Sequence, residues 1–127
     1  MRREKGESIV KYTVSLKENR QFRRLYAKGK NSVTPYLVLY CRKNGRAVSR
    51  LGITVSRKLG KAVTRNKIRR RIREIYRLNE DRLQPGYDLV VVARVKAAYG
   101  TYRDLERSFL KLAKQLNLLC GEEQRSG

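Results

Sequence analysis

The segment from Ala62 to Leu78, AVTRNKIRRRIREIYRL, constrains the fold more than any other part of the chain. On a helix that turns about 100° per residue, its large apolar side chains fall in one stripe, formed by Ile68, Ile72, Ile75 and Tyr76. The segment therefore predicts a long helix that packs on a core along one face only. Other elements of the chain must supply the rest of that core.

A basic sector lies beside this stripe. It spans about 100° of the predicted helix and holds Arg69, Arg73, Asn66, Arg77 and Arg70, with Glu74 outside it. From Arg57 to Arg77 the chain has ten basic residues and one acidic residue. Because like charges at i, i+4 spacing oppose a helix, the pattern requires a polyanionic partner. The planar guanidinium fork suits phosphate oxygens, so the sector predicts contact with nucleic acid.

The composition of the whole chain agrees with this interpretation. Its 32 Lys and Arg against 11 Asp and Glu give a net charge of +21, which favours a polyanionic partner. An anionic membrane is the competing partner, but no stretch approaches the ~20 apolar residues of a spanning helix. The N-terminus also lacks the apolar core of a signal peptide, so we expect a cytoplasmic protein. Cys41 and Cys120 form no C-x-x-C motif, which predicts neither a zinc site nor a disulfide.

The sequence predicts no catalytic residues and no metal ligands in the chain itself. It has no histidine, which is the commonest general base and metal ligand. The carboxylates are scattered, and the adjacent pairs Glu80–Asp81 and Glu122–Glu123 are typical of solvated surface.

The local patterns predict a single small α+β domain with the element order α-β-β-α-β-α. The expected helices cover residues 18–27, 62–78 and from Thr101, where T-Y-R-D resembles a capping box, to Leu119; the expected strands cover 36–41, 48–56 and 87–93. One further short strand around Arg57, or a divided first strand, stays open. We expect residues 1–14 to be a mobile basic arm, 15–120 the domain and 121–127 a flexible tail.

The expected strands form a mixed sheet. Strands 36–41 and 48–56 are predicted to pair as an antiparallel hairpin. Strands 48–56 and 87–93 are predicted to lie parallel, because the basic helix connects them in a β-α-β crossover.

Period-two alternation separates the two faces of these strands. It places Leu37, Leu39 and Cys41 on one face, and Val38 and Tyr40 on the other, together with Gly52 and Thr54 of the next strand. The second face is either an open, partly aromatic surface or further core beneath a helix. The strands alone slightly favour the core, where most aromatic residues are found.

Three segments, in order and spacing, resemble the bacterial ribonuclease P protein family. They are NRQFRRLYAKGK, SRLGITVSRKLG and GKAVTRNKIRRRIRE, within a resemblance that covers about residues 16–119. The last segment is similar to the family's arginine-asparagine-arginine signature helix. Its third signature position is Lys67, which keeps the charge but loses the bidentate fork.

The resemblance implies the protein subunit of ribonuclease P, which promotes removal of the 5′ leader from precursor tRNA. In that family a catalytic RNA with bound divalent metal, Mg²⁺ in the holoenzyme, breaks the bond, and the protein, a monomer within the holoenzyme, does not. The family's β-α-β crossover is left-handed, against the general preference.

The resemblance also implies two sets of binding residues. A cleft between the first helix and the sheet would bind the leader through Phe22, Tyr26, Val38, Tyr40 and Thr54. The signature helix would bind the catalytic RNA through Arg65, Asn66, Lys67, Arg69, Arg70 and Arg73. This favours the open interpretation of the second strand face.

Three other classes of protein share some of these features. A ribosomal or other structural RNA-binding protein has similar charge and size but lacks the signature helix. A protein-only nuclease predicts cleavage by the purified chain without RNA. A DNA-binding protein could place an arginine-rich helix in a major groove, but the apolar stripe of this helix must stay in the core.

Overall fold

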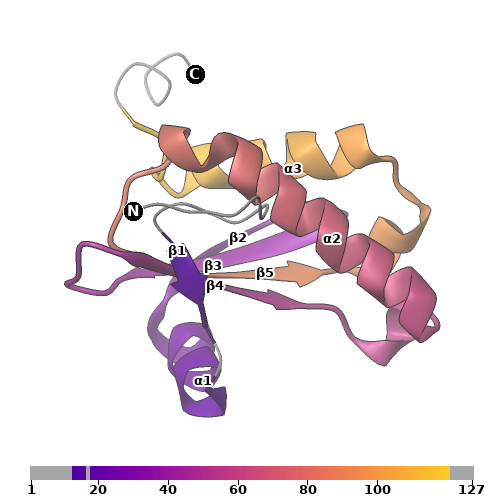
Figure 1. The fold of residues 1–127 in the computed structure, drawn as a ribbon, viewed down its shortest axis with the longest axis horizontal. Helices are drawn as coiled ribbons and strands as arrows, with labels where there is room; N and C mark the ends of the chain where they lie inside the picture. Colours follow the sequence, from indigo (N-terminus) through magenta and orange to yellow (C-terminus); the bar gives the residue numbers. More distant parts are fainter. Residues whose placement is uncertain (1–12, 17, 121–127) are drawn as a thin grey trace, which may run out of the picture.

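The computed structural model describes residues 13–16 and 18–120, which form one sheet with helices on both faces (Figure 1). The strands are β1 (Thr13–Ser15), β2 (Lys30–Val33), β3 (Leu37–Lys43), β4 (Ser49–Thr54) and β5 (Tyr87–Ala93). The α-helices are α1 (Asn19–Lys28), α2 (Ala62–Asn79) and α3 (Tyr102–Gln115), and the short 3-10 helices are η1 (Arg57–Leu59), η2 (Glu80–Arg82) and η3 (Val95–Tyr99). The predicted α+β class is confirmed. None of the helices in these ranges has the length and apolar character needed to cross a membrane.

The five strands form a mixed sheet in the order β1-β4-β5-β3-β2. β4 and β5 are parallel neighbours, and α2 connects them, so the predicted β-α-β crossover is confirmed. The left-handedness of that crossover stays a prediction.

The predicted hairpin is wrong. β3 and β4 do not pair with each other, because β5 lies between them: Leu39 is the partner of Val91, and Val91 is the partner of Ile53. Two strands were not predicted, and neither lies at Arg57, which begins the 3-10 helix η1. One is β2, which pairs with β3 at one edge of the sheet.

The predicted arm, residues 1–14, lies outside the described residues except for Thr13 and Val14, which belong to β1. This short strand pairs in parallel with β4 and forms the other edge of the sheet. The predicted tail, residues 121–127, lies outside the described residues as well.

Helix α3 begins as predicted and ends earlier. The Thr101 hydroxyl accepts a hydrogen bond from the Asp104 amide at 3.1 Å, and the Asp104 carboxylate accepts one from the Thr101 amide at 2.9 Å, which completes the capping box. The helix ends at Gln115, before Asn117 takes a φ of 59°. Leu119 therefore lies beyond the helix, and not on it as predicted. It is buried in a stretch of extended chain that forms a β-bridge with Leu83.

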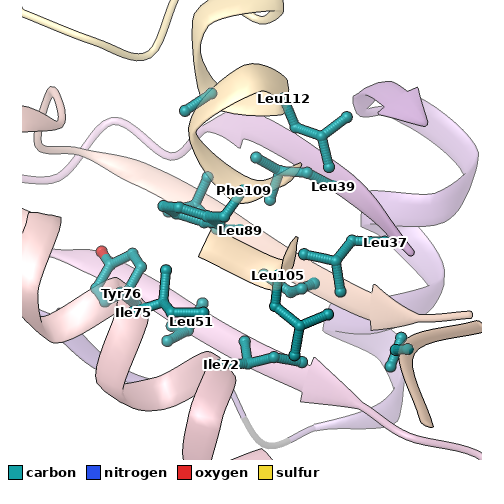
Figure 2. Close-up of a cluster of buried hydrophobic side chains, with 14 of the residues drawn as sticks. Leu37, Leu39, Leu51, Ile72, Ile75, Tyr76, Leu89, Leu105, Phe109 and Leu112 are labelled. Atoms are coloured by element: carbon teal, nitrogen blue, oxygen red, sulfur yellow. The ribbon is translucent and has the colours of Figure 1, made fainter. Parts of the chain in front are cut away.

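The main core lies between the sheet and the helices α2 and α3 (Figure 2). The whole predicted stripe of α2 is buried here, and the Tyr76 ring meets Phe109 of α3 edge-on, with centroids 6.1 Å apart. The sheet supplies the opposite side of this core through Leu37, Leu39, Cys41, Leu51, Leu89 and Val91. α1 covers the other face of the sheet in a smaller cluster around Leu16, Leu25 and Val90 (Figure 1).

Candidate nucleic-acid interface

The α1 face of the sheet is built from three rows of residues that run across β3, β5 and β4. The strand register defines them as Arg42–Asp88–Arg50, Tyr40–Val90–Gly52 and Val38–Val92–Thr54. Because paired residues point to the same side of a sheet, each row offers its side chains to α1. The three rows differ in how far α1 covers them.

The middle row lies beneath α1. Val90 is fully buried, and a Cβ atom at Gly52 would lie 2.6 Å from the ring of Phe22. Glycine at this position therefore leaves the space in which the Phe22 ring packs on β4. Tyr40 ends this row half-buried, in edge contact with Tyr26 at a centroid distance of 4.8 Å.

The third row, Val38–Val92–Thr54, remains partly exposed and is called the open row. Val38, Val92 and Thr54 are each only partly buried, and the Tyr26 hydroxyl lies 3.3 Å from the Thr54 hydroxyl. Beside this pair an open hollow of about 330 Å³ is lined by Asn19, Phe22, Arg23, Tyr26 and Thr54. The structure thus gathers the five predicted leader residues on one face, where rings, a hydroxyl and an apolar row are accessible together.

Four residues of this surface were not predicted from the sequence. Val92 joins Val38 to Thr54 in the row, and Val33 of β2 extends it, since Val33 is the partner of Val38. Asn19 and Arg23 add an amide and a guanidinium to the rim of the hollow. Arg23 was accessible to sequence reasoning, because it lies one residue from Phe22 on a helix with a basic outer face.

The first row, Arg42–Asp88–Arg50, lies at the opposite end of the α1 face and consists of charged residues. Arg50 donates two hydrogen bonds to the Asp88 carboxylate, at 2.8 and 2.7 Å, and Asn44 donates a third at 3.0 Å. Partial burial by itself would raise the pKa of Asp88, but the hydrogen bonds from Arg50 and Asn44 outweigh it and hold that pKa below its ordinary value.

The N-terminal half of α2 carries the predicted contacts with the catalytic RNA. Asn66, Lys67, Arg70 and Arg73 are exposed, as required for such contacts. Arg65 and Arg69 are partly buried and anchored: Arg65 donates to the Gly60 carbonyl at 3.1 Å, and Arg69 donates to the Asn66 side chain at 3.0 Å.

The basic sector is interrupted at the C-terminal end of α2. Arg77, which the helical projection placed in the sector, forms two hydrogen bonds with Glu74, at 3.1 and 2.6 Å. The hydrogen bond from Arg77 lowers the pKa of Glu74. The basic surface is therefore strongest from Arg65 to Arg73.

The two predicted surfaces meet at one end of the sheet. Val55, which directly follows Thr54 of the open row, accepts a hydrogen bond from Arg69 of α2 at 3.5 Å. At this same end, a second hollow of about 390 Å³ carries Lys58, Arg94 and Lys96 in its lining. A strand of nucleic acid that leaves the open row would therefore reach basic side chains directly.

In residues 13–16 and 18–120, the His, Cys, Asp and Glu side chains form no group of three or more that could hold a metal ion. Cys41 and Cys120 are both free thiols. Burial raises the pKa of the Cys41 thiol, although the charge of Lys30 opposes the shift.

Comparison with known proteins identifies the family. The profile of the ribonuclease P family matches residues 10–117. The chain belongs to the ribonuclease P protein family. It is 45% identical over 107 residues to the ribonuclease P protein component of Clostridioides difficile, covering 84% of this chain and 94% of that protein. Membership makes it a subunit of the endoribonuclease holoenzyme that matures the 5′ end of tRNA, as the signature helix predicted.

Solved structures of the family share the fold. The ribonuclease P protein of Staphylococcus aureus superposes with a TM-score of 0.77 at 34% identity, covering 84% of this chain and 97% of that one. The protein of Thermotoga maritima superposes with a TM-score of 0.72 at 36% identity, covering 84% of this chain and 98% of that one.

Proposed function

We propose that this ribonuclease P protein binds the 5′ leader of precursor tRNA on the open row and the catalytic RNA on α2. One observation carries the proposal: the Arg69 side chain of α2 bonds to the carbonyl of Val55, next to Thr54 of the open row. The two surfaces are thereby held at a fixed distance. A leader bound on one side would be aligned with an RNA bound on the other.

The open row suits a single-stranded leader of variable sequence. Aromatic rings stack on the flat face of any base, so binding does not require one particular base. Phe22 and Tyr26 offer such rings, and Val38 and Val92 offer an apolar floor. Arg23 at the rim of the hollow is placed to contact phosphate.

The proposal assigns bond cleavage to the catalytic RNA and its divalent metal ions. Mg²⁺ prefers carboxylate, phosphate and water oxygens. The described residues offer no carboxylate cluster of that kind. The protein's part is therefore to bind and orient the two RNAs, as a single copy within the holoenzyme, and the isolated chain is expected to be inactive.

Reconstitution tests this division of labour. Purified protein freed of RNA should leave precursor tRNA intact, and adding it to the catalytic RNA at low magnesium should restore 5′ processing. Cleavage by the protein alone would contradict the assignment of chemistry to the RNA. Failure to stimulate the RNA would contradict the proposed role as a whole.

The salt dependence of binding tests the role of α2. Replacing the exposed pair Arg70 and Arg73 by Ala should reduce the slope of log affinity against log salt by roughly 1.4, at about 0.7 per lost single-strand phosphate contact. Arg77→Ala is the matched control on the same helix, since the Glu74 carboxylate already engages Arg77. An unchanged slope in the double variant would place the RNA elsewhere, and an equal drop in Arg77→Ala would extend the RNA surface to the C-terminal end of α2.

A further inference from the structure

A second group of exposed apolar side chains lies on the start of α2 and on η3. The exposed large hydrophobic residues in the described ranges are Tyr26, Val33, Val48, Val63, Leu78, Val95 and Tyr99. Tyr26 and Val33 belong to the α1 face of the sheet described above. Val63, Val95 and Tyr99 belong to the start of α2 and to η3, and Tyr99, at 84% exposure, is the most exposed of all.

The segment that carries Tyr99 is firmly held. η3 packs against η1 and α2, beside the N-terminal half of α2 at the right of Figure 1. Ala97 is buried in the core between the sheet and the two helices. Gly100, the residue after Tyr99, accepts a hydrogen bond from Arg71 of α2 at 3.3 Å. The backbone is thus fixed on both sides of Tyr99, while the ring faces solvent.

The part of α2 that contacts this segment is basic. The Arg71 contact with Gly100 brings the Arg71 side of α2 to η3, and Lys67, one turn earlier, is exposed on that side. A rigidly held, exposed ring beside a basic helix is an arrangement on which an unpaired RNA base stacks, while basic side chains of that helix hold neighbouring phosphates.

We propose that Tyr99 is a second base-stacking site, and that it takes an unpaired base of the catalytic RNA. The proposal rests on the proposed function of α2. The position of Tyr99 decides between the two RNAs, because η3 packs into the core on the α2 and α3 side of the sheet. The open row faces the opposite side, towards α1. Tyr99 thus extends the α2 surface and not the leader surface.

A fluorescence experiment tests the site directly. The chain has no tryptophan, so Tyr99→Trp introduces a single indole at the proposed site. Its emission should be quenched when catalytic RNA is added, because a stacked base contacts the ring. Val48→Trp is the control, since Val48 is exposed just before β4, and its neighbours Ala47 and Ser49 line a hollow with Tyr76, in the C-terminal half of α2 and not in the N-terminal half that is proposed to bind RNA. Its emission should change little.

Affinity measurements separate stacking from simple apolar contact. Tyr99→Leu should weaken binding of the catalytic RNA about five- to tenfold, within the range expected for one stacked base. Tyr99→Phe should bind like the unmodified chain, and thermal unfolding should be unchanged in both, because the ring is exposed.

Three results would overturn the inference. Unchanged affinity in Tyr99→Leu, together with unquenched emission in Tyr99→Trp, would remove Tyr99 from the interface while leaving the proposed function intact. Quenching by precursor tRNA alone, and not by the catalytic RNA, would contradict the choice of partner. Failure of the unmodified chain to bind the catalytic RNA would overturn the proposed function as well.

Discussion

The two faces of the central sheet use the same strands for different purposes. On one face, α2 with 18 residues and α3 with 14 bury Leu39, Leu89 and Leu51 completely or nearly so. On the other, α1 has 10 residues and a length of about 15 Å, against roughly 23 Å for a seven-residue strand. A helix this short covers the middle row and leaves Val38, Val92 and Thr54 partly exposed. Alternation along one strand thus supplies the core on one side and, on the other, the partly exposed row that we propose as the binding surface.

The face of the sheet that α2 and α3 cover should contribute most of the free energy of folding. Phe109→Ala should lower the free energy of unfolding by about 3–5 kcal/mol, because it removes a fully buried ring from the core. Urea denaturation followed by circular dichroism measures the loss. Val92→Ala, on the open row, is the control and should cost about 1 kcal/mol or less. Equal losses for the two variants would contradict the difference between the faces.

The charged row should make the α1 face sensitive to acid. The pKa of Asp88 is lowered in the folded protein, so its contribution to stability is present above the unfolded value and is lost as pH falls through the folded value. Asp88→Asn should therefore cost about 2 kcal/mol at neutral pH, from the lost charged hydrogen bonds with Arg50. Unfolding midpoints measured between pH 7 and pH 2 should begin to converge for the two proteins below about pH 4, the ordinary Asp value, and meet only below the lowered pKa of folded Asp88. A difference in unfolding midpoint that persists in acid would mean that Asp88→Asn acts through packing and not through the lost charge.

The middle row should couple packing to binding. Gly52→Ala should displace the Phe22 ring, destabilise the fold by about 1–2 kcal/mol and weaken precursor tRNA binding more than mature tRNA binding. A double-mutant cycle with Phe22→Ala identifies the cause. In the Phe22→Ala background the added methyl should have little effect. Additive losses would mean that Gly52 acts through another neighbour, such as Leu16.

Local sequence patterns predicted the helices well and the strand pairing poorly. α2 was predicted to within one residue, because its apolar stripe is read within the helix itself. The pairing of β3 with β5 joins residues about fifty positions apart, so no local signal separates it from a hairpin. β2, with the sequence KNSV, is a short edge strand with little apolar alternation, and this explains why no strand was predicted there.

The same difference between local patterns and long-range pairing applies to the site residues. Tyr26, Tyr40 and Thr54 could be placed on one face from strand and helix phase together with the family resemblance. Val92 could not, because β5 reads as a continuous apolar run and only its neighbours decide which of its residues stay accessible. The Arg77–Glu74 pair was missed because a helical projection separates residues by angle, whereas long side chains three positions apart can reach each other.

The central claim is that the open end of the α1 face binds the leader. Tyr26→Ala tests it most directly, because this ring is 41% exposed and borders both Tyr40 and Thr54. Affinities of the reconstituted holoenzyme for precursor and mature tRNA should be measured beside thermal unfolding of the variant. The account predicts a loss of about 1 kcal/mol for precursor tRNA, almost no change for mature tRNA and a nearly unchanged unfolding temperature. An equal loss for both RNAs from a well-folded variant would contradict it.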